Sequence, residues 1–272
     1  MKTGVAVRGS IELAFDVEGY GPDLLMIAGS ASTRALWALV RPHLAKRFRT
    51  IAFDNRDSGA STIASQPYTL HALALDAAAV AEAAGSHRVH VLGHSMGGAI
   101  AQEFALTFPE ATASLTLVSS WARGDTYSRN VMEFMLALTR DVTDDKTLLR
   151  AILYAGAGVS TLRSASLAEM TDAAMALGPL APREALARQW ELDAAVDLLE
   201  RVRALRLPAH VIVGTEDRLL PPWHSERLAR AIPNAVLSRI QGVGHLPMVH
   251  APEAFVETIE AFFERLMLRS PA

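Results

Sequence analysis

Short apolar runs alternate along this chain with longer segments of helical character, and this alternation limits the possible folds most. Most of the runs are apolar on both faces, which is typical of strands covered on both sides of a parallel sheet. They lie at 10–17, 24–28, 50–53, 89–92, 115–119, 209–214 and 235–240. Helical stretches lie between them, at about 35–46, 69–84, 96–108, 224–232 and 252–268. The pattern predicts an α/β fold with a mostly parallel, doubly wound sheet flanked by helices. We expect the first two runs to pair as an antiparallel hairpin at the sheet edge.

The alternation stops between about Trp121 and Leu205. Only helical segments are found there, near 127–140, 145–155, 165–177 and 182–201. A helical block inserted into an α/β pattern indicates a lid over one end of the sheet. The sequence therefore predicts a core of residues 1–121 and 206–272 and an all-helical cap of residues 122–205. The alternative is four more core helices in a larger single layer.

Composition excludes several classes of protein. Half of the 272 residues are hydrophobic and 20% are charged, which excludes intrinsic disorder and allows a large buried core. The net charge of −3 leaves no basic surface of the kind that nucleic acid requires. No apolar run approaches the ~20 residues of a membrane span, and the first twenty residues contain no signal-peptide core. The chain has no cysteine, which excludes disulfides and a cysteine nucleophile. We expect a cytoplasmic protein that binds neither nucleic acid nor membrane, either as a monomer or as a homodimer.

A candidate nucleophile follows the run at 89–92, where the chain reads GHSMGG at 93–98 and a helix begins. This is the pattern G-x-S-x-G between a strand and a helix, which places a serine in a tight and strained turn above the sheet. Side chains two residues before and after Ser95 would collide, so both positions are glycine. The helix start places the amide of Met96 beside Ser95, ready to bind a developing oxyanion. The alternative interpretation is a serine N-cap on an ordinary helix.

A serine nucleophile needs a general base, and the base needs an acid that orients it. The run at 209–214 ends in Thr-Glu-Asp-Arg, so Glu216 and Asp217 lie at the same edge of the sheet as Ser95. After the last predicted strand, His245 lies in a glycine-rich loop from which it can reach both Ser95 and the acid. The other eight histidines lack this setting.

Four segments carry a resemblance to α/β-hydrolase fold enzymes with a helical cap: GHSMGG at 93–98, DNRDSGAS at 54–61, GTEDRLLPP at 214–222 and GVGHLP at 242–247. The resemblance covers nearly the whole chain outside the cap. It implies a triad of Ser95, Asp217 and His245, with Asp217 preferred to Glu216 by its position after the strand. It also implies an oxyanion hole made by the main-chain amides of Ser30 and Met96. Relatives usually carry His-Gly directly before the residue that corresponds to Ser30, whereas this chain has Ala28-Gly29 there.

The resemblance implies hydrolysis of a carboxylic ester or lactone through an acyl-serine intermediate, as in esterases and lactonases. No cofactor is expected, and no residue spacing predicts a metal site. The apolar cap residues suggest a small, largely apolar substrate. The alternative is that most of them form the cap's own core. Candidate pocket residues are Gly29, Trp121, Met135 and Leu246.

Two alternatives stay open on the same fold. One is a hydrolase of carbon–carbon bonds in diketones or dienoates, whose members share Ser-Met-Gly-Gly. Those enzymes typically have Asn before the serine and Trp after the histidine, where this chain has His94 and Leu246. The other is a non-catalytic ligand receptor. The identity of the substrate is not predicted.

Overall fold

A single mixed sheet organises the molecule. The computed structural model describes residues 1–269, and within them eight strands form one sheet in the order β1-β2-β4-β3-β5-β6-β7-β8. The strands are β1 (Lys2–Arg8), β2 (Ile11–Glu18), β3 (Asp23–Ile27), β4 (Arg49–Phe53), β5 (Val89–His94), β6 (Thr112–Val118), β7 (Ala209–Gly214) and β8 (Val236–Ile240). Neighbours from β4 to β8 pair in parallel, whereas β2 pairs antiparallel with both β1 and β4. The predicted mostly parallel sheet is therefore confirmed.

The predicted hairpin between the runs at 10–17 and 24–28 is wrong. β2 instead forms a hairpin with β1, which the sequence analysis missed, and its other edge pairs with β4. Gly9, with φ of +62°, opens the two-residue loop between β1 and β2. The sequence did not predict β1 because it is an edge strand that buries few apolar side chains. Ala6 is buried, whereas Val5 and Val7 are 56% and 66% exposed.

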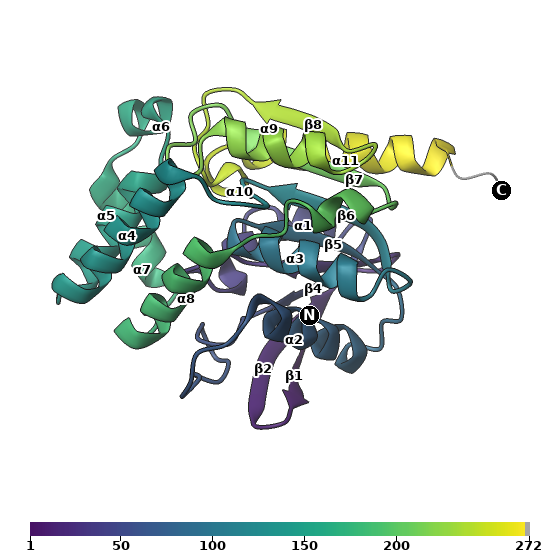
Figure 1. The fold of residues 1–272 in the computed structure, drawn as a ribbon, viewed down its shortest axis with the longest axis horizontal. Coiled ribbons are helices and arrows are strands. Elements are labelled where there is room, and N and C mark those ends of the chain that lie inside the picture. Colours follow the sequence, from purple (N-terminus) through teal and green to yellow (C-terminus); the bar gives the residue numbers. More distant parts are fainter. Residues whose placement is uncertain (270–272) are drawn as a thin grey trace.

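Helices cover both faces of the sheet (Figure 1). The helices outside the inserted segment are α1 (Arg41–Leu44), α2 (Leu70–Ala83), α3 (Met96–Thr107), α9 (Pro222–Ala231), α10 (Pro247–His250) and α11 (Pro252–Arg269), with a 3₁₀ helix at Arg34–Trp37. One face of the sheet packs Leu25, Ile27 and their neighbours against α2, α3 and α9. The other face packs Leu24 and Met26 against α1 and α11. Successive side chains of β3 thus enter opposite layers, as expected for a strand buried on both faces.

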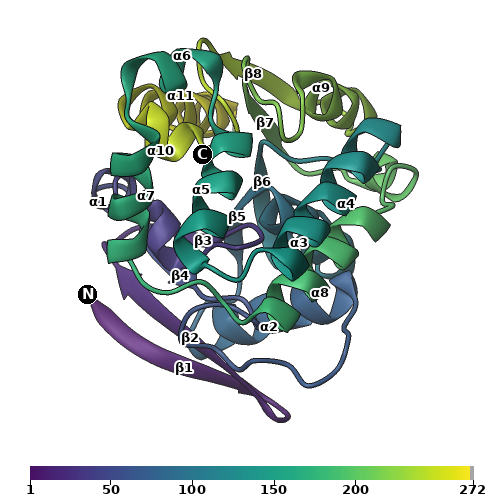
Figure 2. The same cartoon turned by 90° about the vertical axis from the view of Figure 1, so that its left-hand side faces the viewer.

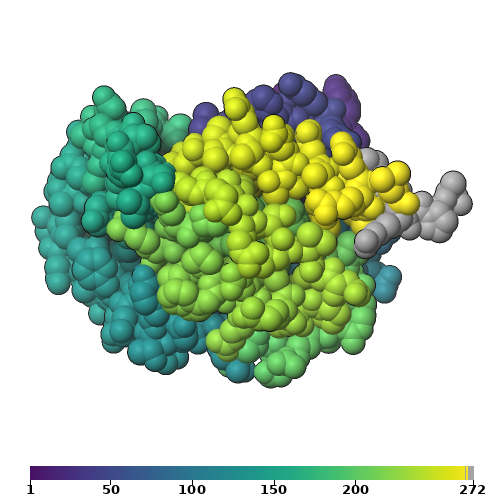
Figure 3. All heavy atoms as spheres, turned by 90° about the horizontal axis from the view of Figure 1, so that it is seen from above, coloured from purple at the N-terminus to yellow at the C-terminus, as the bar shows by residue number. Residues whose placement is uncertain are grey.

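Five helices are inserted between β6 and β7 and gather at one end of the sheet (Figures 1 and 2). They are α4 (Thr126–Asp141), α5 (Asp145–Gly156), α6 (Val159–Ser164), α7 (Leu167–Ala176) and α8 (Arg183–Ala195). The last is shorter than the stretch predicted at 182–201, and a 3₁₀ helix follows at Arg201–Ala204. In the space-filling view these helices adjoin the yellow-green part of the chain around β8 and α10 (Figure 3).

The boundary between a core and a cap stays a prediction. Met132, Met135 and Trp190 of the inserted helices belong to the same buried cluster as Phe104 and Leu117 of the sheet layer. Packing is therefore continuous between the two parts.

No helix within residues 1–269 combines the length and apolarity that a bilayer span requires.

Candidate active site

Ser95 occupies a strained turn between β5 and α3, with φ of +53° and ψ of −121°. Its amide donates to the carbonyl of Val118 on the neighbouring strand (2.9 Å). A Cβ added to Gly93 would lie 2.2 Å from the carbonyl oxygen of Gly97, and one added to Gly97 would lie 2.2 Å from that of Ile27. Real Cβ atoms do not approach backbone so closely, so only glycine fits at either position. The strand, turn and helix predicted around the serine are all present.

His245 and Asp217 meet at the ends of the two last strands. The imidazole Nδ1 of His245 lies 2.8 Å from Asp217 Oδ2. The other carboxylate oxygen, Oδ1, accepts the amides of Leu219 (3.0 Å) and Leu220 (2.9 Å), and both side chains of the pair are buried. A carboxylate partner assigns the Nδ1 proton to that hydrogen bond and leaves the lone pair on Nε2. Within residues 1–269, Nε2 of His245 is buried and has no hydrogen-bond partner.

The serine turn and the histidine loop lie against each other through His94. Its Nε2–H donates to the carbonyl oxygen of His245 (2.9 Å), and the two imidazole centroids are 4.8 Å apart. Burial, and secondly the neighbouring His245, hold the pKa of His94 well below its usual value, so His94 is neutral. No hydrogen bond joins Ser95 Oγ to Nε2 of His245, and such bonds often tighten only when substrate is bound.

Glu216, the rival acid, is engaged elsewhere. Its carboxylate accepts the amide and the hydroxyl of Ser160 on α6, both at 2.6 Å. These hydrogen bonds lower the pKa of Glu216. The structure therefore brings Asp217, and not Glu216, to His245.

The two predicted oxyanion donors lie on either side of the serine turn. Met96 is the first residue of α3, so its amide belongs to the helix N-terminal amides that have no partner within the helix. Gly29 packs against the serine, because a Cβ added there would lie 2.9 Å from Ser95 Cβ. Ser30 follows, and its hydroxyl lies 2.6 Å from Asp193 Oδ2 and 3.2 Å from Met96 Sδ. The loops that carry both donors are thus in contact, while the oxyanion hole itself stays a prediction.

The other predicted pocket residues occupy different environments. Trp121 and Met135 are buried in the cluster that also contains Met96. Leu246, directly after the histidine, is half-buried and packs against the cluster on the opposite face of the sheet. A role in substrate binding stays a prediction for these three residues.

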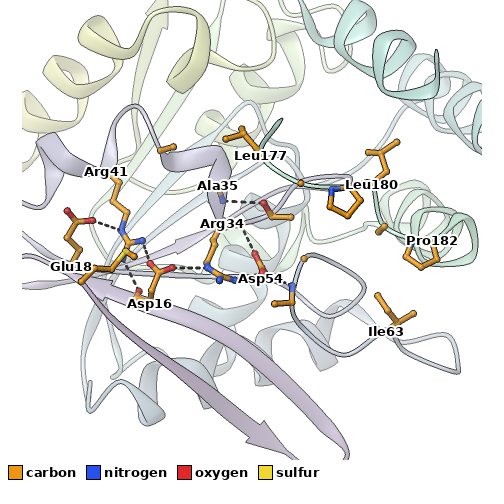
Figure 4. A pocket seen from close by; sticks show the side chains of 18 of the residues that line it. Asp16, Glu18, Arg34, Ala35, Arg41, Asp54, Ile63, Leu177, Leu180 and Pro182 are labelled. Atoms are coloured by element: carbon orange, nitrogen blue, oxygen red, sulfur yellow. Dashed lines mark hydrogen bonds and ion pairs between the residues drawn. The ribbon is translucent and has the colours of Figure 1, made fainter. Parts of the chain in front are cut away.

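A cavity of about 750 Å³ lies beside the start of the 3₁₀ helix at Arg34–Trp37. No residue of the predicted triad or oxyanion hole lines it. Residues 177–182, between α7 and α8, form one wall (Figure 4). The charged side chains that line the cavity pair with one another: Arg34 with Asp16 and Asp54, and Arg41 with Asp16 and Glu18. Because each of them already has a partner, we assign no chemistry to the cavity.

Sequence reasoning missed three side chains on α8 that reach the loops of the site. Arg188 forms two hydrogen bonds to the carboxylate of Asp57 (2.8 and 2.9 Å). Gln189 accepts the amide of Ala31 (2.8 Å), directly after Ser30. Asp193 binds the Ser30 hydroxyl. No motif marks these residues, because their partners lie more than 130 positions earlier in the chain.

Comparison with known proteins identifies the fold family. The family model for the alpha/beta hydrolase fold matches residues 22–252. A protein of Azorhizobium caulinodans that carries the provisional name carbamate hydrolase RutD is 28% identical over 257 residues, covering 93% of this chain and 96% of its own.

Solved structures give the same result. An esterase from Thermogutta terrifontis is 27% identical, with a TM-score of 0.85 over 97% of this chain and 99% of its own. A hydrolase from Pseudomonas aeruginosa PA01 is 25% identical, with a TM-score of 0.86 over 96% of this chain and 98% of its own. The chain belongs to the α/β-hydrolase fold family and is a hydrolase.

Proposed function

We propose that this hydrolase cleaves a carboxylic ester or lactone of a small, largely apolar substrate through an acyl-enzyme on Ser95. The main support is the 2.8 Å contact between His245 Nδ1 and Asp217 Oδ2. Among the described residues, the histidine Nε2 has no hydrogen-bond partner, and its ring packs against His94, next to Ser95. A histidine held in this tautomer is ready to accept a proton.

In the proposed reaction, Ser95 Oγ attacks the substrate carbonyl carbon while His245 Nε2 takes the hydroxyl proton. The carbonyl oxygen becomes an oxyanion that accepts hydrogen bonds from the amides of Ser30 and Met96. His245 then gives its proton to the departing alkoxide, which leaves as an alcohol and releases the acyl-serine. Water, activated in turn by His245, attacks the acyl-serine and restores the free serine with release of the carboxylic acid.

Two contacts support the proton transfers. Asp217 accepts three hydrogen bonds, one from the imidazole and two from backbone amides, which fix the position of its carboxylate. The positive charge that develops on His245 therefore faces a fixed carboxylate. The adjacent His94 is neutral and adds no competing positive charge.

Carbamate hydrolysis is the second candidate, and the 28% identical relative with that provisional name favours it. A carbamate presents the same carbonyl carbon to the serine, with nitrogen on one side. Serine attack and oxyanion stabilisation are common to both candidates. The departing group distinguishes them, since an amine must be protonated more fully than an alcohol before it leaves.

The proposal is tested with Ser95→Ala, assayed on p-nitrophenyl butyrate and by covalent labelling with a fluorophosphonate. We expect the variant to lose both turnover and labelling, while wild type shows both. Ser164→Ala, at an exposed serine on α6, is the matched control and should behave like wild type. Labelling that persists in Ser95→Ala would assign the nucleophile to another residue and overturn the triad.

A substrate panel separates the candidates once turnover is found. We expect alkyl esters and lactones to be hydrolysed faster than carbamates and than a ring-cleavage dienoate. A carbamate with the highest kcat/KM would replace the ester proposal by the second candidate. Absence of turnover on every substrate, with no labelling of wild type, would contradict an acyl-enzyme on Ser95.

A further inference from the structure

A buried carboxylic acid of the inserted helices lies directly over the proposed oxyanion loop. Asp193, in the last turn of α8, is 2% exposed. Its Oδ2 lies 2.6 Å from Ser30 Oγ. Its Oδ1 is buried and has no hydrogen-bond partner within residues 1–269. The mechanism above gives this side chain no role.

The hydrogen bonds around Ser30 favour the neutral acid. The Ser30 hydroxyl has one proton and two neighbours, Asp193 Oδ2 at 2.6 Å and Met96 Sδ at 3.2 Å. If Asp193 is ionised, that proton goes to Oδ2, and the charge on Oδ1 stays buried without a donor. If Asp193 is protonated, it donates to Ser30 Oγ, and the Ser30 proton is free for the sulfur. Only the second arrangement leaves no unpaired charge in the interior.

Within residues 1–269, no arginine, lysine or histidine forms an ion pair with Asp193. Arg188, on the same helix, is committed to Asp57. Glu191 is exposed and pairs with Arg140 of α4. Tyr68, before α2, also lies near Asp193, and burial raises the pKa of its hydroxyl, so it stays neutral. Burial raises the pKa of Asp193 to about 8, although the Ser30 hydrogen bond acts in the opposite direction.

We propose that Asp193 is a positioning residue that works in its protonated form, holding Ser30 so that the Ser30 amide faces the oxyanion. We further propose that ionisation of Asp193 suppresses hydrolysis at alkaline pH. This inference rests on the proposed function. An anion next to the developing oxyanion opposes it electrostatically. The ionised carboxylate also takes the hydroxyl proton of Ser30, which the neutral acid leaves free for Met96 Sδ.

The test compares pH profiles of kcat/KM for wild type and Asp193→Asn, corrected for spontaneous ester hydrolysis. Asparagine keeps an N–H donor for Ser30 and cannot ionise. We expect wild-type kcat/KM to fall above pH 8 by about tenfold for each further pH unit, and Asp193→Asn to lack this fall. Glu191→Gln, an exposed carboxyl on the same helix, is the matched control and should keep the wild-type profile. An unchanged alkaline fall in Asp193→Asn overturns the proposal.

A second measurement needs neither a variant nor turnover. In wild type enriched with ¹³C at aspartate carboxyl groups, infrared spectra should contain the carbonyl band of a protonated aspartic acid at pH 7. That band should disappear with a midpoint near pH 8, and its absence at pH 7 overturns the proposal even where Asp193→Asn does not fold. Failure of the proposed function has a different signature, which is loss of turnover and of Ser95 labelling at every pH.

Discussion

The backbone of Ser95 is the most constrained point of the molecule. A non-glycine residue with φ of +53° costs about 1–3 kcal/mol and persists only where its surroundings enforce it. Here the amide of Ser95 is bound by the Val118 carbonyl, and its own carbonyl accepts the hydroxyl of Ser120 (3.0 Å). The flanking glycines remove the atoms that would otherwise clash. The strain is thus maintained by neighbours on β6 and in the loop after it, which lie far from the serine in the chain.

Gly97→Ala should therefore damage the whole fold. The added methyl would lie 2.2 Å from the Ile27 carbonyl oxygen and 2.6 Å from that of Ala28, and backbone cannot move aside cheaply. We expect a loss of at least ~2 kcal/mol in the free energy of unfolding, measured by urea denaturation. Gly156→Ala is the control, because its methyl would meet only His245 Cβ at an ordinary 3.6 Å. Equal stability of the two variants would contradict this account of the turn.

At the scale of elements, the inserted helices contact both the Ser30 loop and the His245 loop of the proposed site. α8 reaches the Ser30 loop through Gln189 and Asp193. The end of α5 reaches the histidine loop, where the carbonyl of Gly156 accepts the amide of His245 (2.7 Å). Displacement of these helices would remove hydrogen bonds from the proposed base and from the proposed oxyanion loop together. The position of the inserted helices therefore influences how well the loops of the proposed site are ordered.

The ion pair between α8 and the loop after β4 should account for much of this docking. Asp57 is fully buried, and Arg188 forms two hydrogen bonds to its carboxylate. Arg188→Ala leaves that charge buried and unpaired, so we expect a loss of ~3–5 kcal/mol in the free energy of unfolding. Arg140→Ala breaks the exposed pair with Glu191 and should cost less than ~1 kcal/mol. Urea denaturation of both variants checks the difference, and losses of similar size would show that Asp57 finds another partner.

At the scale of the molecule, one buried cluster extends from the sheet into the inserted helices. Its members include Ala99 and Ile100 of α3 and Met135 and Trp190 of the insertion, all of them buried. Separation of the insertion from the sheet would expose apolar surface on both sides at ~25 cal/mol per Å². The inserted helices and the sheet are therefore expected to unfold as one cooperative unit.

Thiol reactivity tests this cooperativity, because the native chain contains no cysteine. Met135→Cys reports on the inserted helices and Ala99→Cys on the sheet layer. In each variant we expect the thiol to become reactive in urea at the midpoint of that variant's own far-UV circular dichroism transition. Reactivity of Met135→Cys at a clearly lower urea concentration would identify an insertion that unfolds separately.

The sequence by itself determined those features of the protein that depend on contiguous residues. Alternating short apolar runs predicted the strands and their parallel pairing, and GHSMGG at 93–98 predicted a serine turn with its strand and helix. The pairing of Asp217 with His245 was foreseeable because each lies in the loop that follows a strand. Such features depend on backbone sterics and side-chain periodicity over a few residues, and both can be inferred directly from the local sequence.

Contacts between distant segments were decided only by tertiary packing. The sequence did not reveal that β2 pairs with β1 and β4 rather than with β3. The edge strand β1 buries too few side chains to produce a recognisable apolar pattern. Nor did it mark Asp193, whose partner Ser30 lies 163 residues earlier. Aspartate in a helix usually faces water, and nothing local distinguishes this one. Its burial, and with it its proton, depends on how α8 packs over the oxyanion loop once the whole chain has folded.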